Sequence, residues 1–213
     1  MIYYRPTDGG PHGTLLPFRP RTCFLMTQMS RPIPPVLTEI RSALKQVLKE
    51  QSYTLVDADS SITGRDFLLK IWEYIISVPL GVAIIHEEMR TETIANIFYE
   101  VGMMQSYGKE TLVIKTPGAT MPSDFVRTEH IQYGSDFKPR MRRFLRSLHD
   151  RASYYSTMAE HVERNPLLSI DFLRRAYLLN PDTRLRDRAR EFFNGAGLED
   201  RAKNSVETML VNF

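Results

Sequence analysis

Residues 80–115 read LGVAIIHEEMRTETIANIFYEVGMMQSYGKETLVIK, and this stretch decides the fold. An almost wholly apolar run, Leu80–Ile85, is separated from a second apolar run, Glu110–Lys115, by polar residues and an amphipathic segment. Strands that are apolar on both sides are typical of parallel sheets covered by helices, whereas half-exposed antiparallel strands alternate. The stretch predicts two such strands joined by a helix from about Thr93 to Tyr107, with Gly108 closing that helix in a left-handed cap.

The same alternation extends to both sides of this stretch. Further strands are predicted at Thr22–Met29, Tyr53–Asp57 and His130–Tyr133, and further helices from the prolines at 32–35 to Gln51 and at Arg65–Val78. Alternating strands and helices with short connections specify a parallel α/β sheet. We therefore expect a flavodoxin-like, doubly wound parallel sheet of about five strands.

No strand signal follows Ser135, and the remaining chain predicts helices only. Residues 137–162 predict one long helix or two, and three more are expected at Ile170–Leu179, Arg184–Phe193 and Glu199–Val211. The run DFLRRAYLLNPD partly resembles the second helix of a tetratricopeptide repeat, but a small helical appendage describes the region better. The expected division is a flexible N-terminal segment (1–21), an α/β domain (22–135) and a helical C-terminal extension (136–213).

Length and composition set the broad class of the protein. The chain has 213 residues, of which 42% are hydrophobic and 25% charged, as is ordinary for a globular protein. A single cysteine, Cys23, excludes an internal disulfide. No apolar run reaches the length of a signal peptide or a membrane span. We expect a cytoplasmic protein that does not associate with membranes.

Basic residues are concentrated between Lys138 and Lys203, although the net charge of the chain is only +3. Such a segment could meet nucleic acid, an acidic partner or another subunit. Acidic residues are interspersed throughout it, however, and arginine-rich helices of this kind are usually solvated faces held by i,i+4 ion pairs. A nucleic-acid or protein partner for these helices is therefore not favoured.

Ligands of an open parallel sheet bind outside the carboxyl ends of its strands. Four segments are expected at those ends: Thr27–Arg31, Asp57–Gly64, His86–Asn96 and Thr116–Phe125. Three of them are rich in acids, hydroxyls or amides. A pocket lined by carboxylates suits sugar hydroxyls and a developing positive charge, and it would repel a bare phosphate.

The stretch NIFYEVG, Asn96–Gly102, is expected within the first turns of the helix that follows the third strand. Asn96 and Glu100 are four residues apart and therefore share a helix face, beside an apolar stripe. Glu100 would lie between core and cleft, where burial raises the pKa of a carboxyl group or a ligand hydrogen-bonds it. From spacing alone, an exposed glutamate paired with a surface lysine is the commoner arrangement.

NIFYEVG, followed by SYGKETLVIK, resembles the motif of the nucleoside 2-deoxyribosyltransferase-like and TIR-like nucleotide-binding proteins. The resemblance covers about Thr22 to Tyr133, and NIFYEVG is its specific part. It implies a flavodoxin-like domain that cleaves or transfers an N-glycosidic bond. It also implies that Glu100 is the nucleophile or stabilising carboxylate at the anomeric carbon, where oxocarbenium character develops.

The remaining binding residues are expected around Glu100 and at the strand ends. Asn96, Asp57 or Asp59 would hold ribose hydroxyls, and Tyr99 would stack on a base or pack against the protein. The backbone around Thr27, Gln28 and Met29 would approach a base or a phosphate.

Two departures from the transferase pattern affect the predicted reaction. Transferase-type members usually follow the third strand with an aspartate and a hydroxyl residue, whereas this chain has His86-Glu87-Glu88-Met89, in which Glu87 or Glu88 would substitute. His86 fits a structural hydrogen-bonding role better than a catalytic one. Thr27-Gln28-Met29 also lacks the glycine of a G-P-F turn.

These differences favour a TIR-like hydrolase that cleaves NAD or a related nucleotide through Glu100. The alternatives are a nucleotide-binding module without chemistry and a nucleoside deoxyribosyltransferase. The nucleotide would be substrate or ligand, with no further cofactor, and the five histidines and one cysteine show no paired spacing for a metal site. Family members often complete their site with a neighbouring subunit, so a homo-oligomer is expected.

Overall fold

The computed structural model describes residues 8–10, 17–58, 67–125 and 128–196, and the account below concerns these residues. The chain divides into two compact units. We call Thr22–Arg65 with Leu80–Arg146 the sheet unit, and Met1–Arg21 with Asp66–Pro79 and Ser147–Phe213 the helical unit.

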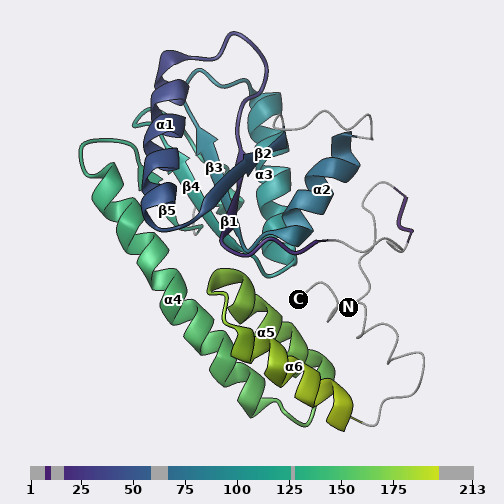
Figure 1. Cartoon of the computed structure of the whole chain (residues 1–213). Coiled ribbons are helices and arrows are strands. Elements are labelled where there is room, and N and C mark those ends of the chain that lie inside the picture. The colour runs from purple at the N-terminus through teal and green to yellow at the C-terminus, as the bar shows by residue number, and fades with distance from the viewer. Residues whose placement is uncertain (1–7, 11–16, 59–66, 126–127, 197–213) are drawn as a thin grey trace. The chain divides into compact units, whose positions relative to one another are not determined.

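The sheet unit is built on five parallel strands in the order β2-β1-β3-β4-β5 (Figure 1). This is the order of flavodoxin-like sheets, and it confirms the expected fold class. The strands are β1 (Thr22–Met26), β2 (Thr54–Asp57), β3 (Leu80–Ile85), β4 (Glu110–Lys115) and β5 (His130–Gln132).

Burial follows the position of each strand in the sheet. Every residue of the central strands β1 and β3 is buried, whereas the edge strand β2 is exposed or half-buried. Gly81 of β3 allows a close approach, because a Cβ atom there would lie 2.8 Å from Met26 Cε and 2.9 Å from Met104 Cε. The sheet and the helix that carries Met104 are therefore packed tightly at this point.

Helices cover both faces of the sheet. On one face, α1 (Pro35–Glu50) is tied to the start of α4 (Phe137–His161) by Arg142 Nε to Glu50 Oε2 at 2.8 Å and Lys138 Nζ to Gln46 Oε1 at 2.8 Å. On the opposite face, α3 (Thr91–Ser106) packs over β3 and β4 (Figure 1). Right-handed crossovers in this strand order require that arrangement.

The end of α3 has the expected left-handed cap. Gly108 has a φ of +66°, its N–H donates to Gln105 O at 2.9 Å, and the N–H of Lys109 donates to Met104 O at 3.0 Å. These two bonds form a Schellman motif, which satisfies carbonyl groups that the helix end would otherwise leave open.

The helical unit comprises α2 (Phe67–Ser77), the part of α4 from Ser147, α5 (Pro166–Leu179) and α6 (Thr183–Gly195). Residues 137–161 thus form one long helix, not two. The second half of α4 packs with α5 and α6 around Ala159, Ile170, Leu173 and Ala189. The helix expected at Glu199–Val211 lies outside the described residues.

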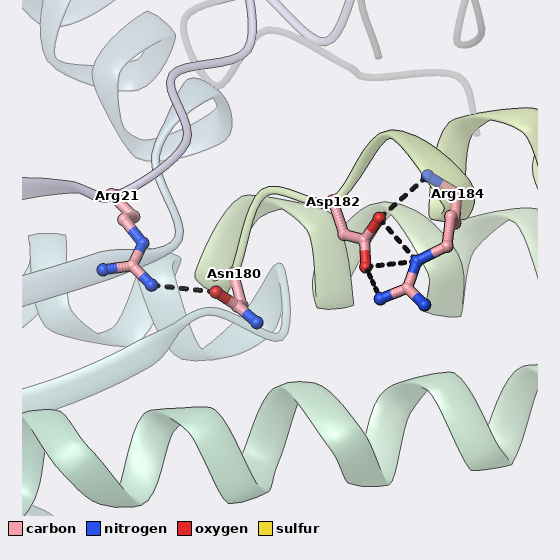
Figure 2. A network of polar contacts seen from close by, with 4 residues as sticks. All are labelled: Arg21, Asn180, Asp182 and Arg184. Atoms are coloured by element: carbon pink, nitrogen blue, oxygen red, sulfur yellow. Dashed lines mark hydrogen bonds and ion pairs between the residues drawn. The ribbon is translucent and has the colours of Figure 1, made fainter.

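Short polar turns set the boundaries of α5 and α6. Asn165 accepts a hydrogen bond from Leu168 N at 3.2 Å and precedes a proline at the first helical position. Asp182 caps α6 by accepting from Arg184 N at 2.9 Å, and its carboxylate also binds the Arg184 guanidinium (Figure 2). Beside this cap, Arg21 donates to Asn180 Oδ1 at 2.8 Å (Figure 2).

Within the helical unit, the end of the N-terminal segment is bonded to α2 and α5. Arg19 N donates to Ser77 O and Arg21 N to Leu178 O, both at 2.8 Å, and Phe18 stacks under the Arg174 guanidinium. Residues 1–7 and 11–16, which make up most of the expected flexible segment, lie outside the described residues.

Several arginine side chains of the C-terminal helices are paired with acids at the surface. Arg188 bonds Glu160 at 2.7 Å, with further pairs at Arg184–Asp182 and Arg190–Asp187, whereas Arg175 bonds the buried Asp171 at 2.9 Å. This pairing is the pattern of a solvated face with interspersed acids. Among the described helices, none has the length and apolarity needed to cross a membrane.

The glycine cap of α3 can be tested against a glycine inside the same helix. Gly108→Ala should lower the free energy of unfolding by about 1 kcal/mol, because alanine is strained in the left-handed region. Gly102→Ala should raise it by up to about 1 kcal/mol, since alanine favours the helix and its Cβ would meet only Phe125 Cζ, at 3.8 Å. Urea denaturation measures both. Shifts of the same sign would contradict the cap.

Candidate functional site

The carboxyl ends of β1, β3 and β4 bring polar side chains to one edge of the sheet. Thr27 and Gln28 follow β1, His86 and Glu87 follow β3, and Thr116 follows β4. Because neighbouring strands are parallel, these positions lie along the same edge, which is where open α/β sheets bind ligands. We call these five residues the edge cluster.

A hydrogen bond joins the edge cluster across β1 and β3. His86 Nε2 lies 3.0 Å from Gln28 Oε1, and the His86 side chain is only 2% exposed. In the sheet, β2 lies on one side of β1 and β3 on the other, so the strand order reverses between β1 and β3. The bond between Gln28 and His86 lies at this point. Crevices form at such switch points. His86 is thus hydrogen-bonded and lies at the edge of the sheet where open α/β folds bind ligands.

A second link joins β3 to β4. The Thr116 hydroxyl donates to Glu87 Oε2, and this bond is the main cause that lowers the pKa of Glu87, helped by the Glu87 backbone N–H and the nearby His86. Thr116 itself is buried. The sequence named the segment that begins at Thr116 but not this residue as part of a site. A hydroxyl directly after a buried parallel strand was the available signal.

Asp57 is the last residue of β2 and contacts a helix. Asp57 forms an ion pair with Arg41 of α1, at 2.7 Å between Oδ2 and the guanidinium. This arginine offsets the negative charge that Asp57 brings to the edge. Asp59 lies outside the described residues, and Met29 is half-buried after β1.

Glu100 lies farther along α3 than the sequence indicated. The helix begins at Thr91, so Glu100 is in its third turn, about 14 Å along the axis at a rise of 1.5 Å per residue. Phe98 and Gln105 share one face of α3: Phe98 packs on Phe125, with ring centroids 4.7 Å apart, and Gln105 donates to Thr111 and Thr128. Helix geometry places Glu100 on the opposite face. Glu100 therefore leaves the helix on the side away from those contacts.

The Glu100 carboxyl group is half-buried, and burial raises its pKa to about 7. Within the described part of the chain, no side chain or backbone group donates a hydrogen bond to it, and no cation pairs with it. A buried carboxylate without a partner costs free energy in the folded state. A strongly shifted group of this kind is a reason to look for a functional role.

Asn96 and Tyr99 occupy the outer surface of α3. Asn96 is exposed, and the Tyr99 side chain is 56% exposed, so both are accessible to a ligand rather than packed in the core. Phe98 is buried and packs against Phe125. The described hydrogen bonds connect Gln28 with His86 and Glu87 with Thr116, and they do not extend to Asn96, Tyr99 or Glu100.

Two other chemistries find little support among the described residues. Cys23 is fully buried in β1, and burial raises the pKa of its thiol, which disfavours a nucleophilic thiolate. No group of three or more histidine, cysteine, aspartate or glutamate side chains in the described ranges is placed to hold a metal ion.

In comparisons with known proteins, no family model matches the chain, and no curated protein matches it. A solved structure with a similar fold is the 2-deoxyribosyltransferase of the psychrotolerant bacterium Bacillus psychrosaccharolyticus. It is 12% identical, with a TM-score of 0.42, and the alignment covers 57% of this chain and 90% of that one. The TIR-like part of the resemblance has no support in these comparisons. Any function therefore has to be argued from the residues of this chain.

The buried carboxyl group gives a pH-dependent stability that can be measured. In the unfolded chain Glu100 ionises near pH 4.5, and in the folded protein near pH 7. The folded state is therefore disfavoured progressively as the pH rises from about 4.5 to 7, and by a constant amount above that range. Glu100→Gln should be more stable than the wild type at pH 8, by up to about 3 kcal/mol, and equal to it near pH 4.5.

Chemical denaturation at pH 5 and pH 8 measures this difference. Glu92→Gln, an exposed position in the first turn of the same helix, is the control. It should change the stability by less than about 1 kcal/mol and in the opposite direction, because an ionised glutamate near a helix N-terminus is stabilising. A Glu100→Gln effect that does not depend on pH would show that burial does not shift this group.

Proposed function

We propose that this protein acts on the N-glycosidic bond of a nucleoside, with the Glu100 carboxylate at the anomeric carbon, and that it transfers the deoxyribosyl group between bases. The observation that carries the proposal is Glu100 itself. It is half-buried, it has no hydrogen-bonding partner among the described residues, and it belongs to the stretch NIFYEVG. The shared fold alone would not support a reaction, since one fold hosts many.

The environment of Glu100 suits this chemistry. In the free protein the ionised carboxylate is poorly solvated, so it is destabilised. When the base departs, positive charge develops at the sugar C1′, and a carboxylate that lacks other partners interacts with that charge strongly. The interaction is therefore greater in the transition state than in the ground state, which is the condition for catalysis.

The transfer proceeds in two balanced steps. The carboxylate oxygen forms a bond to C1′ while the C1′–N bond breaks, and the departing base keeps the bonding electrons and takes up a proton. A second base then attacks C1′, releases the carboxylate and loses its own proton. Water in place of the second base gives hydrolysis.

The contact between Glu87 and Thr116 favours transfer over NAD hydrolysis. From the sequence, the absence of an aspartate and hydroxyl pair after the third strand disfavours a transferase. In the structure, Glu87 at the end of β3 accepts a hydrogen bond from Thr116 at the end of β4. An acid and a hydroxyl are thus together at that edge, although they come from different strands. Nothing in the described structure singles out NAD as the substrate.

The test is an exchange reaction followed by chromatography. The full chain is incubated with a 2′-deoxynucleoside and a different free base, and the new nucleoside is quantified. We expect exchange, with a loss of at least about a hundredfold in Glu100→Gln and near-normal activity in Glu92→Gln. Parallel samples without acceptor, and with NAD, measure hydrolysis and nicotinamide release.

The outcomes separate the candidate functions. Nicotinamide release that depends on Glu100 would favour the NAD hydrolase predicted from the sequence. Saturable nucleoside binding in calorimetry without turnover would make the protein a binding module. Exchange that persists in Glu100→Gln would remove Glu100 from the reaction.

The pH dependence of the exchange gives an independent check on the nucleophile. Only the ionised carboxylate can attack C1′, and burial raises the pKa of Glu100 to about 7. We expect kcat/KM to fall about tenfold per pH unit below that value and to level off above it, since kcat/KM reports ionisations of the free enzyme. An acid limb near pH 4.5 would instead indicate a well-solvated carboxylate.

A further inference from the structure

The hydrogen bond between Gln28 and His86 shows which ring nitrogen of the histidine faces an acceptor. Gln28 Nε2 lies 2.8 Å from Ser30 O and 3.2 Å from Pro32 O. Carbonyl oxygens only accept, so the group that faces them must be the NH₂ of the amide. Gln28 Oε1 therefore faces His86.

An amide oxygen also only accepts, so His86 Nε2, 3.0 Å away, must carry the hydrogen. In a neutral imidazole the other nitrogen, Nδ1, is then an acceptor. None of the described residues donates a hydrogen bond to Nδ1. The imidazole is 2% exposed, and it stands at the reversal point of the strand order, where a crevice for a ligand is expected.

We propose that Gln28 holds His86 as an acceptor at Nδ1, and that this nitrogen selects a substrate base that presents an amino group over one that presents a carbonyl at the same position. The inference rests on the proposed nucleoside function and adds the class of base to it. Adenine and cytosine present an amino donor, whereas hypoxanthine and uracil present an oxygen there. A carbonyl opposite Nδ1 would place two acceptors face to face, and both would lose their hydrogen bonds to water.

Glu87 and Thr116 lie next to His86 but do not remove this selectivity. The Glu87 carboxylate is engaged by the Thr116 hydroxyl. His86 Nδ1 is therefore an acceptor of the edge cluster to which no described residue donates a hydrogen bond. The remaining acceptor capacity of Glu87 would favour the same amino group. Gln28 acts through His86, and we describe it as a positioning residue.

Two matched pairs of nucleosides test the proposal. 2′-Deoxyadenosine with 2′-deoxyinosine, and 2′-deoxycytidine with 2′-deoxyuridine, differ chiefly in an amino or an oxo group. Calorimetry on the full chain carrying Glu100→Gln, which prevents turnover, should give a preference of about five- to tenfold for the amino member of each pair.

Gln28→Glu should reverse or abolish this preference. A carboxylate beside Nε2 favours the doubly protonated imidazole, in which Nδ1 becomes a donor. His86→Asn offers either an oxygen or an NH₂ near the position of Nδ1, so its preference should fall to near one. Gln132→Glu, which makes the same change of charge at an exposed residue of β5, should keep the wild-type preference.

The tautomer is measured separately by ¹⁵N NMR of the histidine side chains, with His86→Asn used to assign the signal. Hydrogen on Nε2 is expected, and hydrogen on Nδ1 alone would overturn the proposal. Equal affinities within each pair, or a preference that Gln28→Glu leaves unchanged, would overturn it while base exchange still stands. Absence of both binding and exchange would remove the proposed function and this inference with it.

Discussion

The parallel pairing of β1 with β3 is the constraint on which the rest of the structure depends. Two wholly buried strands pair side by side, and the chain leaves them in opposite directions, toward β2 and toward β4. That reversal separates the loops at one edge of the sheet, and the polar side chains that follow the strands lie at this edge, outside the apolar core. Gln28 and His86 meet at this place because their strands are neighbours, although 58 positions separate them in sequence.

The same packing governs the acidity of Glu100. The residue belongs to a helix whose buried side chains, among them Ile97, Val101 and Met104, lie against the sheet. Those contacts draw the neighbouring carboxyl group away from water without supplying a partner for it. Hydrophobic burial thus stabilises the helix and, at the adjacent position, raises the pKa of Glu100. An ionised Glu100 would be stabilised by a positive charge placed beside it.

Much of the fold could be predicted from the sequence, since apolar runs such as Leu80–Ile85 and Glu110–Lys115 leave few alternatives to a buried parallel strand. The cap at Gly108 was also predictable, because only glycine adopts that conformation cheaply. The site was harder to predict from the sequence. The contact of Thr116 with Glu87 depends on which strands are neighbours, and spacing within one segment cannot reveal it. The helix start predicted at about Thr93 is two residues late, because polar residues before Thr93 obscure the beginning of the helix at Thr91.

Gly81 brings the backbone of β3 close to the helix that carries Glu100. Its missing side chain lets Met104, and with it α3, approach β3, while the opposing contacts are the pliable thioether ends of two methionines. A Cβ atom at position 81 would meet these flexible ends first, and they can shift without moving the backbone of either element. The close approach of α3 to the sheet thus tolerates small changes at its tightest point.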